Sequence, residues 1–304
     1  MPEEERDRYH DFGELNVVVT SHLSRGCGSS GSLTEKRERM RVRNGMEETE
    51  NLFDLCGKVA VVTGGSGALG RAISMGLASR GVDVVACSVE QEMLEELADE
   101  IHKTTVRKAL PVFCDVTDIR SVDRMVNRAI NRCGKIDILF NGAGIAHRKP
   151  LVEMEVEDWQ KVMDVNVKGT LIPCRAVAKQ MIERGEGGSI ITVGSVRGFH
   201  AQKDGYTAYG TSKTEVHYLT KQMAIEWAEH NIRVNCIAPC VVWSPLTKPI
   251  LSDKESYRKY TSRIPMGRAA EPEDLVGATV FLASDASKMV TAHILSVDGG
   301  TVGG

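Results

Sequence analysis

The sequence lacks the features that mark membrane, disulfide-rich and nucleic-acid-binding proteins. No apolar run approaches the roughly 20 residues that a membrane-spanning helix needs. The eight cysteines are scattered and none forms a Cys-x-x-Cys pair, which argues against a disulfide framework or a metal site and favours a reducing, cytoplasmic compartment. The formal net charge is only −3, so we expect neither a nucleic-acid partner nor a membrane surface. A globular protein that acts on small molecules fits these absences.

The first 45 residues differ in composition from the rest of the chain. They are rich in charged residues, serine and glycine, and such a segment cannot bury enough apolar surface to become ordered. Two interpretations stay open here. Residues 1–45 are a disordered extension, or Met46 is the true start of the protein. In both cases we expect residues 46–304 to form one folded domain.

From Gly57 onwards, short apolar segments alternate with segments of helical periodicity. Strands that alternate with helices predict a single doubly wound α/β domain, a Rossmann fold with a seven-stranded parallel sheet and helices on both faces. The stretch 243–265 is the least regular, and we expect a short lid there. The expected strands are 58–63, 82–87, 110–114, 136–141, 189–194, 233–238 and 293–297, and the expected helices are 70–80, 90–102, 122–133, 159–184 and 209–230.

Tyr209 and Lys213 are four residues apart, which places them on one face of a helix. At about 5 Å and an effective dielectric of about 20, an ammonium attracts a phenolate by about 3 kcal/mol. That attraction would bring the pKa of a phenol from about 10 toward neutrality. A tyrosine with such a pKa can act as a general acid or base. The spacing alone is common, so the interpretation depends on other motifs.

A glycine-rich turn joins the first expected strand to the first expected helix. It reads Thr63-Gly64-Gly65-Ser66-Gly67-Ala68-Leu69-Gly70. Glycines allow backbone N–H groups to approach a pyrophosphate, and the helix N-terminus that follows favours a negative charge. The position of this turn therefore predicts a dinucleotide site that includes Gly64, Ser66, Leu69 and Gly70.

The end of the second strand bears on the choice between NAD and NADP. An acidic residue that binds the adenosine ribose would stand at Ser88, where this chain has no carboxylate to repel a 2′-phosphate. No Arg or Lys follows to bind that phosphate, and Glu90 is close by. The sequence leaves NAD(P) open, with a slight preference for NADP.

Several motifs occur in a fixed order and together resemble the short-chain dehydrogenase/reductase family. The resemblance extends from Gly57 to the C-terminal end. The motifs are the glycine-rich turn, Asn141-Gly142-Ala143-Gly144, Asn166, Ser195, Tyr209 with Lys213, Arg233 to Pro239, Met266-Gly267-Arg268 followed by Glu271 to Asp274, and Val297-Asp298-Gly299-Gly300. The family implies a Rossmann catalytic domain that interconverts a secondary alcohol and a ketone by hydride transfer.

The resemblance also implies a role for each matching residue. Tyr209 would transfer the proton, Lys213 would lower the pKa of the tyrosine and bind the nicotinamide ribose, and Ser195 would hydrogen-bond the substrate oxygen. Asn166 would hold a water in a proton relay. The remaining implied cofactor contacts are Asp115 and Val116 at the adenine, Asn141, Gly142 and Ala143 near the adenosine ribose, and Val242 and Ser244 at the carboxamide.

Four positions depart from the family pattern: Ala68, Gly142, Cys240 and Ser244. Ala68 requires a backbone conformation that alanine can adopt. Cys240 would lie near the nicotinamide, where it could be either sensitive to thiol reagents or buried and inert. None of the departures removes a residue with an implied catalytic role.

Polar and basic residues flank the expected substrate pocket. Arg197, His200, Gln202, Lys203 and Asp204 lie between Ser195 and Tyr209, and His147-Arg148-Lys149 follows Gly144. They favour a small, oxygenated and anionic substrate, and the chain is most similar to gluconate 5-dehydrogenases and related sugar-acid or polyol oxidoreductases.

Two other interpretations stay open. Since 3-oxoacyl carrier-protein reductases share these motifs, the basic residues could instead meet an acidic carrier protein. A nucleotide-binding sensor or scaffold without turnover is the alternative of another class. Members of the family commonly form tetramers, and the helices 159–184 and 206–229 suit such contacts.

Overall fold

The computed structural model describes residues 51–203, 205–245 and 247–303, which form one α/β domain. The predictions for residues 1–45 and for Met46 lie outside these described residues. A seven-stranded parallel sheet runs through the centre in the order β3-β2-β1-β4-β5-β6-β7. The strands are β1 (Val59–Thr63), β2 (Asp83–Ser88), β3 (Ala109–Phe113), β4 (Ile138–Asn141), β5 (Gly188–Val193), β6 (Ile232–Pro239) and β7 (Ile294–Val297).

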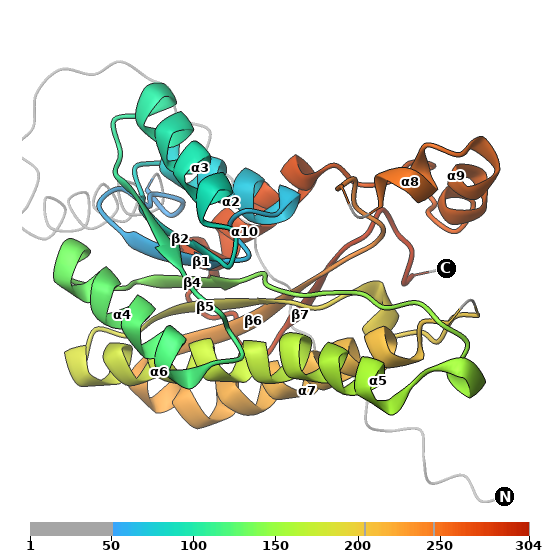
Figure 1. Ribbon diagram of the computed structural model, residues 1–304. Coiled ribbons are helices and arrows are strands. Elements are labelled where there is room, and N and C mark those ends of the chain that lie inside the picture. The colour runs from blue at the N-terminus through green and yellow to red at the C-terminus, as the bar shows by residue number, and fades with distance from the viewer. Residues whose placement is uncertain (1–50, 204, 246, 304) are drawn as a thin grey trace, which may run out of the picture. The chain divides into compact units, whose positions relative to one another are not determined.

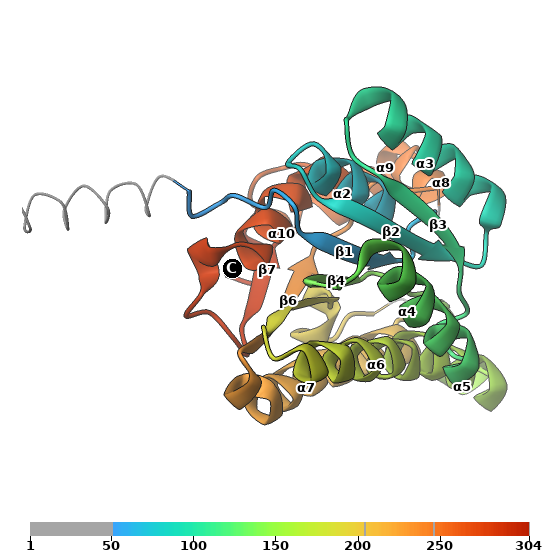
Figure 2. The same ribbon diagram turned by 90° about the vertical axis from the view of Figure 1, so that its left-hand side faces the viewer.

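Helices cover both faces of the sheet (Figure 1). One layer contains α2 (Ala68–Ala78), α3 (Gln91–Thr104) and α10 (Val276–Ala283), and the other contains α4 (Ile119–Cys133), α5 (Val156–Met163), α6 (Gly169–Arg184) and α7 (Thr207–Trp227). Figure 2 shows the same three layers from the side. The predicted doubly wound fold is confirmed.

The strands at the centre of the sheet are largely apolar because helices cover both of its faces. Within β1, Ala60 and Val62 belong to the core under α2, α3 and α10, whereas Val59 and Val61 belong to the core over α4, α6 and α7. Side chains of a strand alternate between the two faces, so a strand covered on both sides needs an apolar residue at every position.

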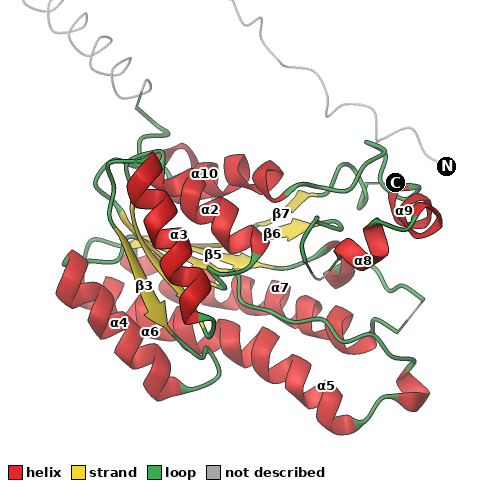
Figure 3. Ribbon diagram, turned by 45° about the horizontal axis from the view of Figure 1, so that its top comes forward, coloured by secondary structure: helices red, strands yellow, loops and turns green. Residues whose placement is uncertain are grey.

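Three segments differ from the sequence predictions. The expected helix 159–184 is divided by a π-helical segment, Asp164–Lys168, which separates α5 from α6. The stretch 243–265 contains two short helices, α8 (Lys248–Leu251) and α9 (Lys254–Thr261), which lie at one side of the domain (Figure 3). Helix α10 was not predicted, because its sequence VGATVFLA is apolar around much of its circumference and lacks a helical periodicity.

No helix among the described ranges is both long enough and apolar enough to cross a membrane. Within the same ranges, no group of His, Cys, Asp or Glu side chains is arranged to hold a metal ion.

Candidate active site

A cavity of about 390 Å³ opens at the carboxyl ends of the strands. Ligands of doubly wound sheets bind at this edge, where neighbouring strands such as β1 and β4 connect to opposite faces. The predicted residues in its lining are Leu69, Gly142, Ser195, Tyr209, Lys213, Val242 and Ser244. The other predicted residues, which lie outside this lining, are Gly64, Ser66, Gly70, Ser88, Asp115, Val116, Asn141, Ala143 and Asn166.

Tyr209 and Lys213 lie in the first turns of α7, and their side chains meet as the spacing predicts. The Lys213 Nζ is 5.6 Å from the centroid of the Tyr209 ring. The same ammonium donates a hydrogen bond to the carbonyl oxygen of Val193 at the end of β5, at 2.8 Å. Lys213 is almost fully buried, and this burial lowers its pKa to about 8.

The pKa of Tyr209 is governed by different neighbours from those expected. Burial raises the pKa of the phenol, whereas a hydrogen bond from Ser195 and the positive charge of Arg197 lower it. The sequence assigned the lowering to Lys213. In the structure the ammonium of Lys213 lies near the ring and is hydrogen-bonded to Val193, so its charge is not directed at the phenol oxygen.

Ser195 follows β5 by two residues and begins the 3₁₀ turn Val196–Gly198. Its hydroxyl oxygen accepts a hydrogen bond from the backbone N–H of Arg197 at 3.1 Å. Its hydroxyl proton is thus available to Tyr209 or to a substrate oxygen in the cavity. The backbone N–H of Ser195 points away from the cavity and donates to Nε2 of His217 at 3.4 Å.

Asn166 is fully buried in the π-helical segment. Its Oδ1 accepts from the backbone N–H of Ile145 at 2.8 Å, and its Nδ2 donates to the Ile145 carbonyl and to Ser212 Oγ, each at 2.9 Å. The side-chain amide therefore ties the segment after β4 to α7. Its own backbone carbonyl accepts a hydrogen bond from Thr170 Oγ1 at 2.7 Å.

The glycine-rich turn fits a dinucleotide. Gly64 has a φ of 69°, and a Cβ there would lie 3.0 Å from the backbone nitrogen of Ala143. A Cβ at Gly70 would overlap the carbonyl oxygen of Gly64. Helix α2 starts at Ala68, so its first N–H groups face the turn and Ala68 itself is helical, as an alanine requires. Backbone atoms here come as close as a pyrophosphate site needs.

Ser66, Ser88 and Glu90 form a hydrogen-bonded cluster at the end of β2. Ser66 Oγ donates to Glu90 Oε2 at 2.6 Å and lies 2.7 Å from Ser88 Oγ. Since the single Ser66 proton goes to Glu90, the Ser88 hydroxyl is the donor to Ser66. Although Ser88 itself has no carboxylate, the carboxylate of Glu90 therefore lies beside the glycine-rich turn.

Other predicted cofactor residues have side chains that are already engaged. Asn141 Oδ1 accepts from Thr63 Oγ1 at 2.8 Å, and its Nδ2 donates to the Thr170 carbonyl at 3.0 Å. Asp115 Oδ1 accepts from both the backbone and the hydroxyl of Thr117. Asn141 can therefore offer a nucleotide mainly its backbone, whereas Asp115 keeps its second carboxylate oxygen as an acceptor. A Cβ at Gly142 would lie 2.7 Å from the Phe140 ring, so the glycine is needed there.

The segment after β6 is held by a residue that the sequence analysis missed. The Thr247 hydroxyl donates to the Val242 carbonyl at 2.6 Å and accepts from the Ser244 backbone N–H at 2.9 Å. Cys240 lines the cavity beside this segment, and burial raises the pKa of its thiol, which makes the thiolate scarce. The structure thus favours the inert reading of Cys240.

Residues 65–302 match the family described as enoyl-(acyl carrier protein) reductase. The 2-dehydro-3-deoxy-D-gluconate 5-dehydrogenase of Dickeya dadantii is 38% identical over 254 residues, which cover 82% of this chain and 97% of that enzyme. The chain belongs to the short-chain dehydrogenase/reductase family. It is an NAD(P)-dependent oxidoreductase that acts on CH–OH groups, which confirms the predicted family, fold and type of reaction.

Two further relatives of this dehydrogenase/reductase show the range of its neighbours. The 3-oxoacyl-(acyl-carrier-protein) reductase of Thermotoga maritima is 37% identical over 246 residues, which cover 81% of this chain and 98% of that protein. The crystal structure of a gluconate 5-dehydrogenase from Burkholderia cenocepacia, in complex with NADP and tartrate, superposes with a TM-score of 0.80 at 34% identity. That alignment covers 84% of this chain and 98% of the other.

An arginine–tyrosine cluster forms the outer wall of the dehydrogenase/reductase cavity. The guanidinium carbons of Arg148 and Arg197 lie 4.8 Å and 5.3 Å from the centroid of the Tyr206 ring. The Tyr206 hydroxyl is 2.9 Å from the Tyr260 hydroxyl of α9. Among the described residues, no carboxylate forms an ion pair with Arg148 or Arg197. The sequence could have indicated that Tyr206 belongs to this site, since it precedes Tyr209 by three residues. Tyr260 is distant in the sequence, and no local pattern indicates its position.

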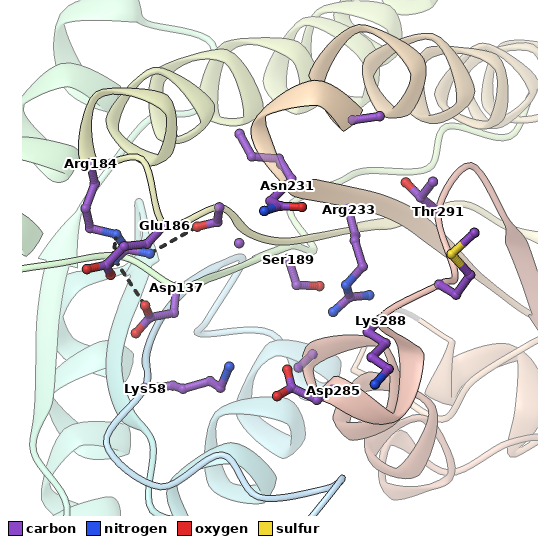
Figure 4. A pocket seen from close by; sticks show the side chains of 16 residues that line it. Lys58, Asp137, Arg184, Glu186, Ser189, Asn231, Arg233, Asp285, Lys288 and Thr291 are labelled. Carbon is purple, nitrogen blue, oxygen red and sulfur yellow. Dashed lines mark hydrogen bonds and ion pairs between the residues drawn. The ribbon is translucent and has the colours of Figure 1, made fainter. Parts of the chain in front are cut away.

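A second cavity, of about 510 Å³, lies at the amino ends of the strands. Three of its charged groups, Arg184, Asp137 and Glu186, lie against one another (Figure 4). Arg184 lies 3.0 Å from Asp137 and 3.2 Å from Glu186, and Arg233 donates to Ser287 Oγ and to the Leu282 carbonyl, each at 2.8 Å. These groups have little capacity left for a ligand.

Proposed function

We propose that this enzyme interconverts a secondary alcohol and a ketone on a small sugar acid, as a gluconate 5-dehydrogenase does. The observation that carries the proposal is the position of Arg148 and Arg197 in the same cavity as Tyr209. Among the described residues no carboxylate pairs with either guanidinium group, which favours a negatively charged group on the substrate. The tartrate in the Burkholderia cenocepacia structure, a hydroxy acid, supports this class of substrate.

In this proposal, Tyr209 gives its proton to the carbonyl oxygen during reduction and takes it back during oxidation. Ser195 donates a hydrogen bond to the same oxygen and stabilises the charge that develops there. Lys213 lies deeper, where its ammonium can reach both the ring of Tyr209 and a ribose hydroxyl. The bound nicotinamide supplies or accepts the hydride.

Asn166 keeps its proposed place in a proton relay with Lys213. A Cβ at Gly144 would lie 3.2 Å from Asn166 Oδ1 and 3.6 Å from Lys213 Nζ, so the two side chains approach each other on either side of this glycine. A relay water would bind beside Asn166, whose two amide protons are already donated to Ile145 and Ser212.

The proposed cofactor site follows the carboxyl edge of the sheet. The glycine-rich turn and the start of α2 would hold the pyrophosphate through Gly64, Ser66, Leu69 and Gly70. Ser88 would face the adenosine ribose, and Val242 and Ser244 would face the carboxamide. The remaining proposed contacts are Asp115, Val116, Asn141, Gly142 and Ala143.

For cofactor preference, we propose that NADP is accepted and slightly preferred. The neutral Ser88 hydroxyl and the NADP bound by the Burkholderia cenocepacia enzyme support this preference. Glu90 is the group that opposes it, since a carboxylate and a 2′-phosphate repel each other. Values of kcat/KM with NAD and with NADP test the proposal, and a strong NAD preference would overturn it.

We also propose a lid, a homotetramer and a compartment for this enzyme. The stretch 243–265 would act as a lid, and its contact with the cavity through Tyr260 supports this. A homotetramer would form through α5, α6 and α7, where Leu171, Tyr218 and Ile225 are exposed. The seven free cysteines of the described ranges support a reducing, cytoplasmic compartment.

A substrate panel tests the proposed function. Reduced nicotinamide absorbance would be followed with gluconate, 5-keto-D-gluconate, a neutral polyol of the same length and an acetoacetyl thioester. Sugar acids should give the highest kcat/KM. A preference for the thioester would favour the 3-oxoacyl carrier-protein reductase activity, for which the likeness to the Thermotoga maritima enzyme is the supporting observation. Tight cofactor binding without any turnover would instead indicate a sensor or scaffold.

A further inference from the structure

A buried histidine lies directly behind the proposed active site. His217 stands one helical turn beyond Lys213 on α7, so it points to the same face as Tyr209 and Lys213. Only 6% of its surface is exposed. None of the catalytic roles proposed above uses this side chain, although it contacts the backbone on both sides of Ser195.

Two glycines make room for the imidazole. A Cβ at Gly194 or at Gly198 would overlap the ring of His217, and these glycines flank the turn that begins at Ser195. The ring of Phe199 covers a further side, with its centroid 4.6 Å from that of His217. The histidine ring therefore fills a slot whose walls are the backbone that carries Ser195.

One ring nitrogen is a hydrogen-bond acceptor for that backbone. Nε2 accepts the Ser195 backbone N–H at 3.4 Å, so the proton of the neutral ring is on Nδ1. Ser195 in turn has its hydroxyl oxygen fixed by the Arg197 N–H. The two hydrogen bonds hold Ser195 at its nitrogen and at its side chain.

The surroundings of His217 keep the ring neutral, as an acceptor must be. Burial and the positive charges of Lys213 and Lys221 on the same helix lower its pKa to about 4. Across from the ring, β6 contributes the thiol of Cys236, whose own pKa burial raises to about 11. The 3₁₀ turn contributes Arg197, whose guanidinium lies over the Tyr206 ring instead.

We propose that His217 is a positioning residue, whose imidazole fixes the backbone of Ser195 so that the Ser195 hydroxyl faces Tyr209. The inference rests on the roles proposed for Ser195 and Tyr209. Without the acceptor, the Ser195 turn would lose its anchor and the hydroxyl would lose its hydrogen bond to the phenol. Since that hydrogen bond lowers the pKa of Tyr209, its loss should raise this pKa.

The test compares H217Q with H217M. Glutamine can place an amide oxygen near the position of Nε2, whereas methionine fills a similar volume without a strong acceptor. We expect H217M to lower kcat for 5-keto-D-gluconate reduction by about tenfold to a hundredfold, because small displacements of catalytic groups have effects of that size. The dissociation constant of the cofactor should stay within about twofold, and the pKa of the oxidation pH–rate profile should move upward. H217Q should restore both kcat and the profile.

Two results would overturn the proposal. Equal losses in H217Q and H217M would show that His217 only packs, and wild-type behaviour of H217M would show that the acceptor has no role. If H217M does not yield folded protein, H217N replaces it, because the asparagine side chain is one methylene shorter than that of glutamine and its amide cannot reach the Ser195 N–H. Y209F distinguishes failure of the proposed function from failure of the role of His217. If Y209F keeps its activity, the proposed function is wrong. If Y209F is inactive and H217M is fully active, only the proposed role of His217 is wrong.

Discussion

A cavity lies at each end of the sheet, and the two cavities differ in whether carboxylates lie against their arginines. At the amino end, in the larger cavity of about 510 Å³, the carboxylates of Asp137 and Glu186 compensate the charge of Arg184. At the carboxyl end, the cavity of about 390 Å³ brings Arg148 and Arg197 beside Tyr209 with no carboxylate paired to either among the described residues.

This difference shows that cavity volume is a poor guide to function in this protein. A functional site needs buried groups whose hydrogen bonds and charges are incomplete until a ligand arrives. At the amino end, the charge of Arg184 is compensated by Asp137 and Glu186 without any ligand. The carboxyl-end groups have shifted pKa values, as Lys213 and His217 do, because burial is not compensated by a counter-charge.

The largest expected effect is that of Tyr209→Phe. Loss of the phenol removes the proton donor, and kcat should fall by about a thousandfold, or about 4 kcal/mol. Cofactor binding, measured by fluorescence titration, should be unchanged. Tyr218→Phe on the same helix is the matched control, since Tyr218 is 70% exposed. A Tyr209→Phe enzyme with more than a tenth of wild-type kcat would break the contrast between the two ends.

The pH dependence of stability gives the next effect. The pKa of His217 is about 4 in the folded protein and about 6.5 in the unfolded chain, so the unfolded chain binds more protons between these values. The stabilisation is complete above pH 6.5 and is lost as the pH falls to 4, by about 3 kcal/mol. Urea unfolding at pH 7 and pH 4.5 measures it. H217Q should show a shallower loss, and identical slopes in both proteins would contradict the assignment.

Arg148→Gln should weaken recognition of an acidic substrate. We expect kcat/KM for the sugar acid to fall by about thirtyfold, or about 2 kcal/mol, because a charged hydrogen bond is lost. The value for a neutral polyol should change little. Lys288→Gln in the amino-end cavity is the control, and steady-state kinetics with both substrates measure the set. An equal effect of the two substitutions would remove the distinction between the cavities.

The smallest expected effect concerns the cofactor. Glu90→Gln removes a negative charge from the cluster with Ser66 and Ser88 and should raise the ratio of kcat/KM for NADP over NAD by about tenfold, or about 1.4 kcal/mol. Ser88→Asp adds a carboxylate at the same cluster and should shift the ratio the other way. If neither substitution moves the ratio, the ribose does not bind beside these residues.

Much of the fold follows from local sequence patterns. The apolar strands and the glycine-rich turn are each specified by adjacent residues, and the alternation of strands with helices predicted the parallel sheet. Helix α10 was missed because uniformly apolar sequence has no periodicity to read. The π-helical segment Asp164–Lys168 was missed because one extra residue in a turn does not interrupt a helical pattern of this kind.

Contacts within the site could be predicted when both residues belong to one helix, and could not when the residues come from several elements. Tyr209 and Lys213 share a helix, and their contact follows from their spacing. The influence of Arg197 on the phenol, the insertion of His217 between two glycines and the contact of Tyr260 with Tyr206 depend on tertiary packing. No local pattern in the sequence reports such distances.

Asn141 has a consequence for how the cleft can open. Its buried amide joins Thr63 at the end of β1 to the Thr170 carbonyl in α6. These hydrogen bonds hold the carboxyl ends of β1 and β4 and the start of α6 together. If the stretch 243–265 acts as the proposed lid, entry and exit of small molecules would depend on movement of α8 and α9, and the rate of that movement would set an upper limit on turnover.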